Sequence, residues 1–473
     1  MNKYKNTSIV LIIFISSLFI FVLYFIFFQL YPQELFICDV YKTSTLKLNS
    51  INFEFLYPLN KCDDKIYLNT VLTLENIISE GNNPYQNRPL YLISSYLIYQ
   101  SLDFFVKDSN SFISVLPELS YFIVQLIYFV TAVFITMKIL AKYFVINKTD
   151  IIMGTVLLSL NPLIQFGVFT PSNHTLTFLV FVVSLYFLEK LQNSKRLFFY
   201  SLMLGFLFLL NRSFFISLIA INLFFLYKNR NRYKVLILNG ISIVIFFIPN
   251  FLYKQFLSYN SVNLYDINTE FYGQFIWLSK YFNEGIGFWI SKILLPDKLF
   301  DLRLTKSWDS NGSKEEWYCQ NIPENFVCYA NDSIELLKYL TIPVLLVSIF
   351  LFYNKFRSTI LHRVFLVGAV SYGFWSLIGW YPPVRFNMYS LGNLLFVLII
   401  IGFLQLESLK YKICYFIICN LYLFNIVHWN NPNLLSFNLK TLILLISVFA
   451  FGFISFRNNV KLKISSSVND QNK

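Results

Sequence analysis

Long apolar runs, separated by short basic clusters and two long polar segments, make up the whole chain. Runs of about 20 apolar residues are what an α-helix needs to cross a hydrocarbon layer ~30 Å thick. The first run, Ile9 to Leu30, is too long for a signal-peptide core and carries no small-residue cleavage site, so it predicts a helix that stays in the protein. The pattern therefore predicts an all-α multipass membrane protein with about 12 transmembrane helices.

The basic clusters set the predicted orientation, because loops on the cytoplasmic side carry an excess of Lys and Arg. Lys3 and Lys5 place the N-terminus inside, and both long polar segments are acid-rich and so are expected outside. The predicted order is a first transmembrane helix in residues 1–30, an extracytoplasmic loop in 31–116, transmembrane helices 2–7 in 117–256, a second extracytoplasmic loop in 257–335, transmembrane helices 8–12 in 336–456 and a cytoplasmic tail in 457–473.

Two apolar stretches are too long for a single crossing and predict helical hairpins. Residues 151–189 break at Thr170-Pro171-Ser172-Asn173-His174, which we expect outside. Residues 197–227 have basic clusters on both flanks, so both ends belong inside and the chain must turn at Asn211-Arg212-Ser213. An arginine near the membrane midplane is costly, so Arg212 should face a polar cavity or the outer interface.

Composition agrees with a membrane protein and argues against nucleic acid. Charged residues make up 13% of the chain and hydrophobic residues 56%, whereas a soluble domain carries roughly 25% charged residues. The net charge of +13 comes from clusters between apolar runs. The sequence has no Walker-type loop and no G-x-G-x-x-G, so a cytosolic nucleotide is not the expected energy source. The excess of Ile, Asn, Lys and Phe is typical of AT-rich coding, which favours a bacterium, so the expected location of this multipass protein is a bacterial inner membrane.

Cysteines support the topology independently. Cys38 and Cys62 fall in the first outer segment, and Cys319 and Cys328 fall in the second, so each holds one potential disulfide for an oxidising compartment. A Cys38–Cys62 bond would bring Asp39 next to the adjacent pair Asp63 and Asp64. Free thiols are the alternative.

The acidic pair is the strongest candidate for chemistry. Asp63 and Asp64 could supply a general base or ligands for a divalent cation such as Mg²⁺ or Mn²⁺, and Asp39 could join them. The alternative is a helix N-cap. Two apolar stripes follow and predict amphipathic helices that lie on the membrane, with packing against the protein's own helices as the alternative: Tyr67, Val71, Leu74 and Ile78, then Leu90, Ser94, Leu97, Ser101 and Phe105.

Three arginines are predicted on the outer face: Arg88, Arg212 and Arg385. The planar guanidinium suits phosphate oxygens, so they are candidates for binding a lipid phosphate, with ordinary headgroup contacts as the alternative. His174, at the predicted outer hairpin tip, is a weaker candidate for a substrate or a metal.

This arrangement resembles the C-superfamily of glycosyltransferases, which includes protein O-mannosyltransferases and lipid A aminoarabinose transferases. The resemblance rests on Asp63-Asp64-Lys65-Ile66-Tyr67, on Asn87-Arg88-Pro89-Leu90, and on the Leu210-Asn211-Arg212-Ser213 and Pro383-Val384-Arg385-Phe386 turns. It implies a polyprenyl-phosphate sugar donor, a glycan, lipid or protein acceptor, and inverting transfer on the extracytoplasmic face. In this chain the acidic pair comes some thirty residues after the first helix, later than is usual in the family.

The expected function is therefore a membrane glycosyltransferase with an Asp base and arginines at the donor phosphate. A lipid-linked glycan polymerase, ligase or transporter of the envelope polysaccharide pathway is the runner-up. A non-catalytic assembly protein that binds lipid is a third hypothesis, and it predicts that the Asp pair points away from any cavity.

Overall fold

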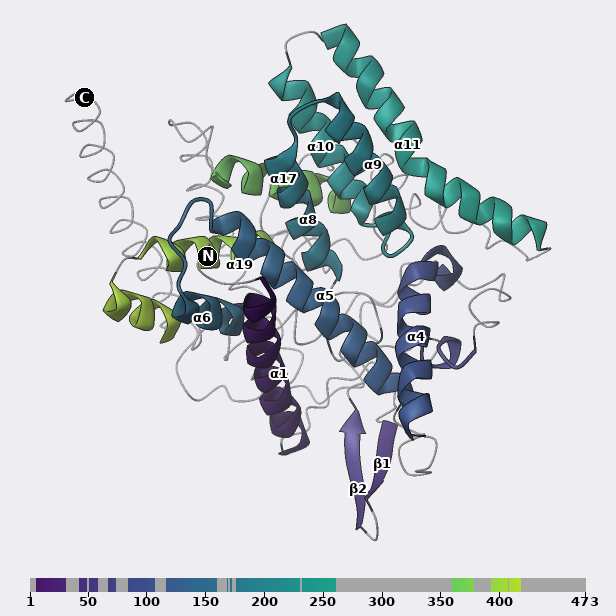
Figure 1. Ribbon diagram of the computed structural model, residues 1–473, viewed down its shortest axis with the longest axis vertical. Helices are drawn as coiled ribbons and strands as arrows, with labels where there is room; N and C mark the ends of the chain where they lie inside the picture. Colours follow the sequence, from purple (N-terminus) through teal and green to yellow (C-terminus); the bar gives the residue numbers. More distant parts are fainter. Residues whose placement is uncertain are drawn as a thin grey trace, which may run out of the picture.

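The computed structural model describes residues 6–30, 42–48, 51–57, 67–73, 84–106, 116–159, 168, 171, 176–229, 232–260, 360–377, 393–406 and 408–417. Within these ranges the body is helical, and one two-stranded hairpin projects from it (Figure 1). The predicted all-α class is confirmed for the helical body. The hairpin is an addition that the sequence did not predict.

The described elements run in the order that follows. The helices are α1 (Asn6–Leu30), η1 (Pro84–Asn87, a 3₁₀ helix), α4 (Pro89–Val106), α5 (Leu116–Leu140), α6 (Lys148–Ser159), α8 (Leu176–Lys190), α9 (Ser194–Phe208), α10 (Phe214–Lys228), α11 (Arg232–Tyr259), α17 (Ile360–Leu377) and α19 (Asn393–Gln405), with further helical residues at 67–70 and 409–417. The strands β1 (Lys42–Leu48) and β2 (Ile51–Tyr57) pair antiparallel, from Lys42 opposite Tyr57 to Leu48 opposite Ile51.

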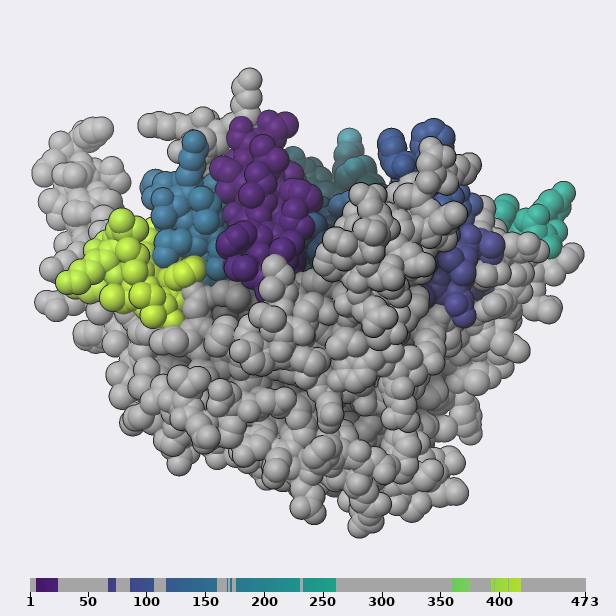
Figure 2. All heavy atoms as spheres, turned by 90° about the horizontal axis from the view of Figure 1, so that it is seen from below, coloured from purple at the N-terminus to yellow at the C-terminus, as the bar shows by residue number. Residues whose placement is uncertain are grey.

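Helix α8 lies at the centre of the described body and packs against α5, α10 and α17 (Figure 1). All ten residues from Leu176 to Leu185 are buried, because the sequence is apolar on every side. Helix α6 packs between α1 and α19, and Figure 2 shows α1 beside α6 at the surface. The centre of the described body is thus a 15-residue helix whose only charged residues, Glu189 and Lys190, lie in its last turn.

Helices α9, α10 and α11 form a packed group on one side of α8 (Figure 1). Ser201 and Ser242 share a hydrogen bond of 2.7 Å between their hydroxyls, and one turn further along Gly205 faces the carbonyl of Phe246. The two contacts have the same spacing on both helices, so α9 and α11 run parallel. Glycine and serine allow this close approach in an otherwise apolar interface.

The predicted turn between two short helices is confirmed. Helix α9 ends at Phe208 and α10 begins at Phe214. The amide oxygen of Asn211 accepts a hydrogen bond of 2.8 Å from the backbone N–H of Ser213, which is the local bond that makes Asn a turn former. The helix predicted after Pro89 is confirmed as well, with Pro89 as its first residue.

Three described helices are long and apolar enough to cross a membrane: Asn6–Leu23 within α1, Leu116–Leu140 and Tyr233–Tyr259 within α11. Helices α1 and α11 also turn apolar side chains away from the protein, among them Leu11, Phe19, Val244 and Phe251. The predicted crossings at 336–353 and 438–456 lie outside the described residues.

The two predicted apolar stripes have different outcomes. Leu90, Leu97 and Phe105 of α4 point away from the protein, as a membrane-facing stripe should. Tyr67 and Val71 are buried inside the protein, so the expectation that they face lipid is wrong. The helix predicted there also stops at residue 70, and its continuation beyond residue 73 lies outside the described residues. The Tyr67 ring packs against Tyr91 and Tyr121, and these contacts between distant segments decide its burial in place of the local apolar stripe.

Candidate functional site

Of the predicted site residues, the structure describes Arg88 and Arg212. The remaining predicted residues lie outside the described residues: Asp39, Asp63, Asp64, His174, Arg385, Cys38, Cys62, Cys319 and Cys328. The site is therefore built from the two arginines and from the described residues nearest to the others in the sequence.

Arg88 lies between η1 and α4 and is half-buried. Its Nη1 donates a hydrogen bond of 2.9 Å to the hydroxyl of Tyr67. Tyr67 is only 1% exposed and follows Asp64 by three residues. The buried tyrosine thus links the segment after the acidic pair to Arg88.

Arg212 lies in the α9–α10 turn and is also half-buried. A backbone hydrogen bond of 3.2 Å joins the N–H of Leu90 to the carbonyl of Leu209. Leu90 follows Arg88 by two residues, and Leu209 precedes Arg212 by three. The start of α4 therefore rests on the turn that carries Arg212. A hydrogen bond of 2.9 Å from the Tyr253 hydroxyl to the Gln86 carbonyl adds α11 to this junction.

Three tyrosines form the core of the junction. The ring centroids of Tyr67, Tyr91 and Tyr121 lie 5.8–6.1 Å from one another. Tyr121 donates 2.7 Å to the carbonyl of Tyr67. Tyr91 donates 2.6 Å to the carbonyl of Pro171 and accepts 2.7 Å from the amide of Gln125. Because Pro171 precedes His174 by three residues, the second predicted outer turn is attached to the same junction.

Sequence reasoning missed Glu118. This carboxylate is fully buried in the first turn of α5, one turn before Tyr121 on the same helix face. An acid near a helix N-terminus stabilises the helix by typically 0.3–1 kcal/mol. An exposed acid would give the same stabilisation without the cost of desolvation, so this effect alone does not explain why Glu118 is buried. The available signal was an acid at the edge of a 25-residue apolar run, since ionisable residues in such segments mark functional sites.

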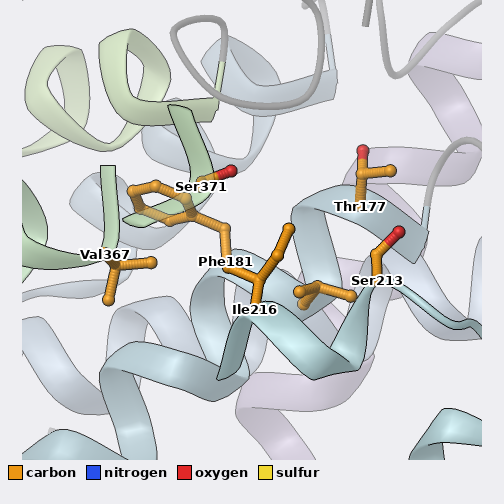
Figure 3. Close-up of a pocket in the computed structure, with 7 residues that line it drawn as sticks. Thr177, Phe181, Ser213, Ile216, Val367 and Ser371 are labelled. Carbon is orange, nitrogen blue, oxygen red and sulfur yellow. The ribbon is translucent and has the colours of Figure 1, made fainter. Parts of the chain in front are cut away.

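A narrow pocket lies next to the Arg212 turn, between α8, α10 and α17 (Figure 3). Thr177, Ser213 and Ser371 contribute hydroxyls, and the rest of the lining is apolar: Val180, Phe181, Ile216 and Val367. It is too narrow to hold a water molecule. This gap is therefore a packing defect beside the site and not a binding cavity.

A second polar cluster lies at the opposite end of α5 and α8. Glu189 accepts 2.9 Å from Lys142 and 2.8 Å from the Tyr143 hydroxyl, and it pairs with Arg363 at the start of α17. Burial raises the pKa of Glu189, but these hydrogen bonds and charges outweigh burial and leave its pKa below the ordinary value. The basic clusters of the sequence predict Lys142, Glu189 and Arg363 on the cytoplasmic side.

The two clusters are separated by the length of one membrane crossing. Tyr121 and Leu140 stand about 29 Å apart along α5 at 1.5 Å per residue, close to the ~30 Å of a hydrocarbon core. The residues expected outside and inside are therefore grouped at opposite ends of the same helix.

Comparison of the chain with protein-family models, curated proteins and solved structures finds no match. Within the described ranges, no three His, Cys, Asp or Glu side chains lie close enough to hold a metal ion together. The described residues thus define a junction of two arginines and three buried tyrosines at one end of the described helical body.

Proposed function

We propose that this chain is an integral membrane glycosyltransferase of a bacterial inner membrane. It moves a sugar from a polyprenyl-phosphate donor to a glycan, lipid or protein acceptor on the extracytoplasmic face. The resemblance to C-superfamily glycosyltransferases suggests the reaction. One observation carries the proposal. Hydrogen bonds join chain segments that are far apart in the sequence, and each of these segments contains a predicted site residue or lies next to one in the sequence.

Those contacts limit how far apart the predicted residues can be. Asp64 precedes Tyr67 by three residues, so their Cα atoms are at most about 11 Å apart in a fully extended chain. The same limit applies to Pro171 and His174. Arg88 binds Tyr67 directly, and the Arg212 turn binds the start of α4. The described residues next to the acid pair and to the histidine in the sequence thus meet the segments of Arg88 and Arg212 at one junction, which supports grouping the predicted residues in one site.

The β-hairpin supports the proposed disulfide between Cys38 and Cys62. Its first pair, Lys42 and Tyr57, brings together two points of the chain that lie four residues after Cys38 and five residues before Cys62. Paired strands hold opposite Cα atoms ~4.5–5.5 Å apart, similar to the ~5.5–6 Å of a disulfide. This closure would hold Asp39 near the acidic pair.

In the proposed reaction an acceptor hydroxyl or amine attacks the anomeric carbon while Asp64, with Asp63 or Asp39 beside it, takes the acceptor proton. The bond from the anomeric carbon to the phosphate oxygen breaks, and Arg212, Arg385 and Arg88 stabilise the charge on the departing lipid phosphate. A single displacement inverts the sugar. A divalent cation, Mg²⁺ or Mn²⁺, is a candidate cofactor that the carboxylates would hold.

The test uses purified protein in lipid nanodiscs with a panel of undecaprenyl-phosphate sugars, and mass spectrometry measures the undecaprenyl phosphate released. Asp64→Asn should lower the rate by roughly 10²–10⁴-fold, the usual contribution of a general base. Asp103→Asn is the matched control, because Asp103 lies near the far end of α4, about 22 Å along the helix from Arg88. Full activity of Asp64→Asn would reject the assigned base.

The runner-up is a lipid-linked glycan polymerase, ligase or transporter. A transporter would move the lipid-linked sugar without releasing undecaprenyl phosphate. Wild-type protein that releases none from any donor, but moves a labelled donor across a vesicle membrane, would replace the transferase proposal with the transport one.

A further inference from the structure

Two basic segments that are separated by a whole helical hairpin meet at one end of α9, α10 and α11. Residues 190–196 contain three Lys or Arg and residues 228–234 contain four, and neither segment contains Asp or Glu. The ammonium group of Lys228 donates a hydrogen bond of 3.4 Å to the carbonyl oxygen of Leu191, so the two segments touch. Together they hold Lys190, Lys195, Arg196, Lys228, Arg230, Arg232 and Lys234.

The parallel packing of α9 and α11 puts their first turns at the same height. Ser201 of α9 shares a hydrogen bond of 2.7 Å with Ser242 of α11. By that alignment Lys195 is level with Leu236, and Lys234 lies only two residues, or about 3 Å, nearer to the start of its helix. Axes of packed helices are ~8–10 Å apart, which is comparable to the Debye length of ~8 Å at physiological salt. The positive charges of the two segments are therefore close enough to act together.

The chain leaves much of this positive charge without a counter-charge. Lys195 and Lys228 are exposed, and neither forms an ion pair within the described part of the chain. The nearest acid in the sequence, Glu189, pairs with Lys142 and Arg363. Helices α8 and α10 end here while α9 and α11 begin here, so their dipoles largely cancel. A partner of opposite charge can therefore bind without displacing an existing ion pair.

The side chains next to the basic segments indicate that this partner is a lipid. Phe199, one turn beyond Lys195 on α9, is 58% exposed, and Leu236 of α11 is 56% exposed. Exposed apolar side chains continue along both helices, to Phe206 on α9 and Phe251 on α11. A soluble acidic partner at the basic end would leave this apolar surface uncovered. A phospholipid fits both parts, with its headgroup at the cations and its acyl chains along the helices.

Two tyrosines place the membrane–water interface at the same height. Tyr227 directly precedes Lys228, Tyr233 directly precedes Lys234, and both tyrosines are exposed. Tyrosine is enriched at membrane interfaces, where its ring lies at the level of the headgroups. The basic segments therefore lie where lipid phosphates are.

We propose that segments 190–196 and 228–234 together bind the headgroups of anionic phospholipids, whose acyl chains lie against α9 and α11. The leaflet is the one at this end of the protein, which the basic clusters predict to be cytoplasmic. The inference rests on the proposed membrane placement, and it does not depend on sugar transfer. It adds a lipid site at the end of the α9–α10 hairpin opposite to the turn that carries Arg212.

The experiment labels the full-length protein in phosphatidylcholine nanodiscs with photoreactive lipids. Trace phosphatidylglycerol or trace phosphatidylcholine, each with a diazirine in the acyl chain next to the glycerol, is activated by light, and peptide mass spectrometry locates the labels. The anionic probe should label the first turns of α9 and α11 at least about tenfold more than the zwitterionic probe at low salt. Added salt should reduce this preference. Equal labelling by the two probes would reject the site.

A matched pair of double variants separates the site from the net charge of the protein. Lys195→Gln with Lys228→Gln removes two charges from the basic segments, and Lys138→Gln with Lys410→Gln removes two exposed lysines elsewhere. Each lysine near an anionic surface contributes roughly fivefold in binding. The first pair should therefore lower the preference for the anionic probe by at least about fivefold, and the second should leave it within about twofold. An equal loss in both pairs would show attraction by net charge alone and would reject the site.

Folding and sugar transfer are read separately. Labelling of α1 by the zwitterionic probe, at the exposed Leu11 and Phe19, should be the same in every variant that folds. The single variants Lys195→Gln and Lys228→Gln should each show a smaller loss of preference, so a double variant that does not fold leaves the site testable. Loss of selective labelling in a protein that releases undecaprenyl phosphate would reject the lipid site alone. Selective labelling in a protein that releases none from any donor would support the lipid site and reject the transferase.

Discussion

Gly205 offers the sharpest test of the helix packing, because a single methyl group would collide with backbone. A Cβ at this position of α9 would lie 2.3 Å from the carbonyl oxygen of Phe246 and 3.0 Å from two ring carbons of Pro249. Real Cβ atoms essentially never approach another heavy atom within 3.0 Å, so α9 and α11 must separate by about 0.7 Å. A backbone oxygen cannot rotate away as a side chain would.

The size of the effect follows from a matched pair of variants. Overpacking of this kind costs typically 1–3 kcal/mol, and separation would also stretch the Ser201–Ser242 hydrogen bond of 2.7 Å. Gly240 of α11 is the control, because a Cβ there meets no atom within 4 Å. Both glycines are inside helices, so the gain of about 1 kcal/mol for Ala over Gly is common to both variants and cancels.

The assay is SDS-driven unfolding in detergent micelles, followed by tryptophan fluorescence. Gly205→Ala should be less stable than Gly240→Ala by about 1–3 kcal/mol. Equal stability of the two variants would show that α9 and α11 do not pack as described.

Two further predictions concern ion pairs, one around Glu189 and one between Lys412 and Asp150 of α6. Acid should weaken the cluster around Glu189. Burial raises the pKa of Glu189, but hydrogen bonds from Lys142 and Tyr143 keep that pKa below its ordinary value. The ionised carboxylate therefore stabilises the folded protein above the unfolded-state pKa, and this stabilisation is lost as pH falls through the folded-state pKa. Unfolding midpoints measured from pH 7 to pH 3 should fall less for Glu189→Gln. Lys412→Met should lower the free energy of unfolding by about 3–5 kcal/mol, because it leaves the buried Asp150 carboxylate without the ammonium group 2.5 Å away. The double variant with Asp150→Asn should recover part of that free energy. No recovery would contradict a direct pair.

The sequence predicted the parts of the fold that depend on local rules. The turn at Asn211 followed from the length of an apolar run with basic ends, and the start of α4 followed from Pro89. Both depend on a single continuous stretch of sequence and not on contacts between distant segments. The orientation of the outer and inner ends was derived from charge and stays a prediction.

The junction itself could not be predicted, because its contacts join residues far apart in the sequence. Tyr91 and Pro171 are 80 residues apart, and Gln86 and Tyr253 are 167 apart. Nothing in the local pattern distinguishes Tyr91 from the many other tyrosines of the chain. Glu118 was overlooked for a related reason. At the edge of an apolar run an acid is expected simply to stabilise the start of a helix. Only its full burial in the structure distinguishes Glu118 from such an acid.

Tyr91 provides the final prediction, since its hydroxyl holds two segments at once. Tyr91→Phe keeps the ring and removes the bonds to the Pro171 carbonyl and the Gln125 amide. Leaving a buried polar group unsatisfied costs about 1–3 kcal/mol. Tyr128→Phe is the matched control, because it removes one hydroxyl contact, 2.9 Å to Ser94, whose own bond to the backbone remains.

Tyr91→Phe should therefore destabilise the protein more than Tyr128→Phe in the same SDS titration. It should also speed deuterium uptake of the segment that follows Pro171, which Tyr128→Phe should leave unchanged. A purely local role for Tyr91 predicts lost stability without faster exchange at that segment. This outcome would separate the His174 turn from the junction and would remove His174 from the proposed site while leaving Arg88 and Arg212 in place.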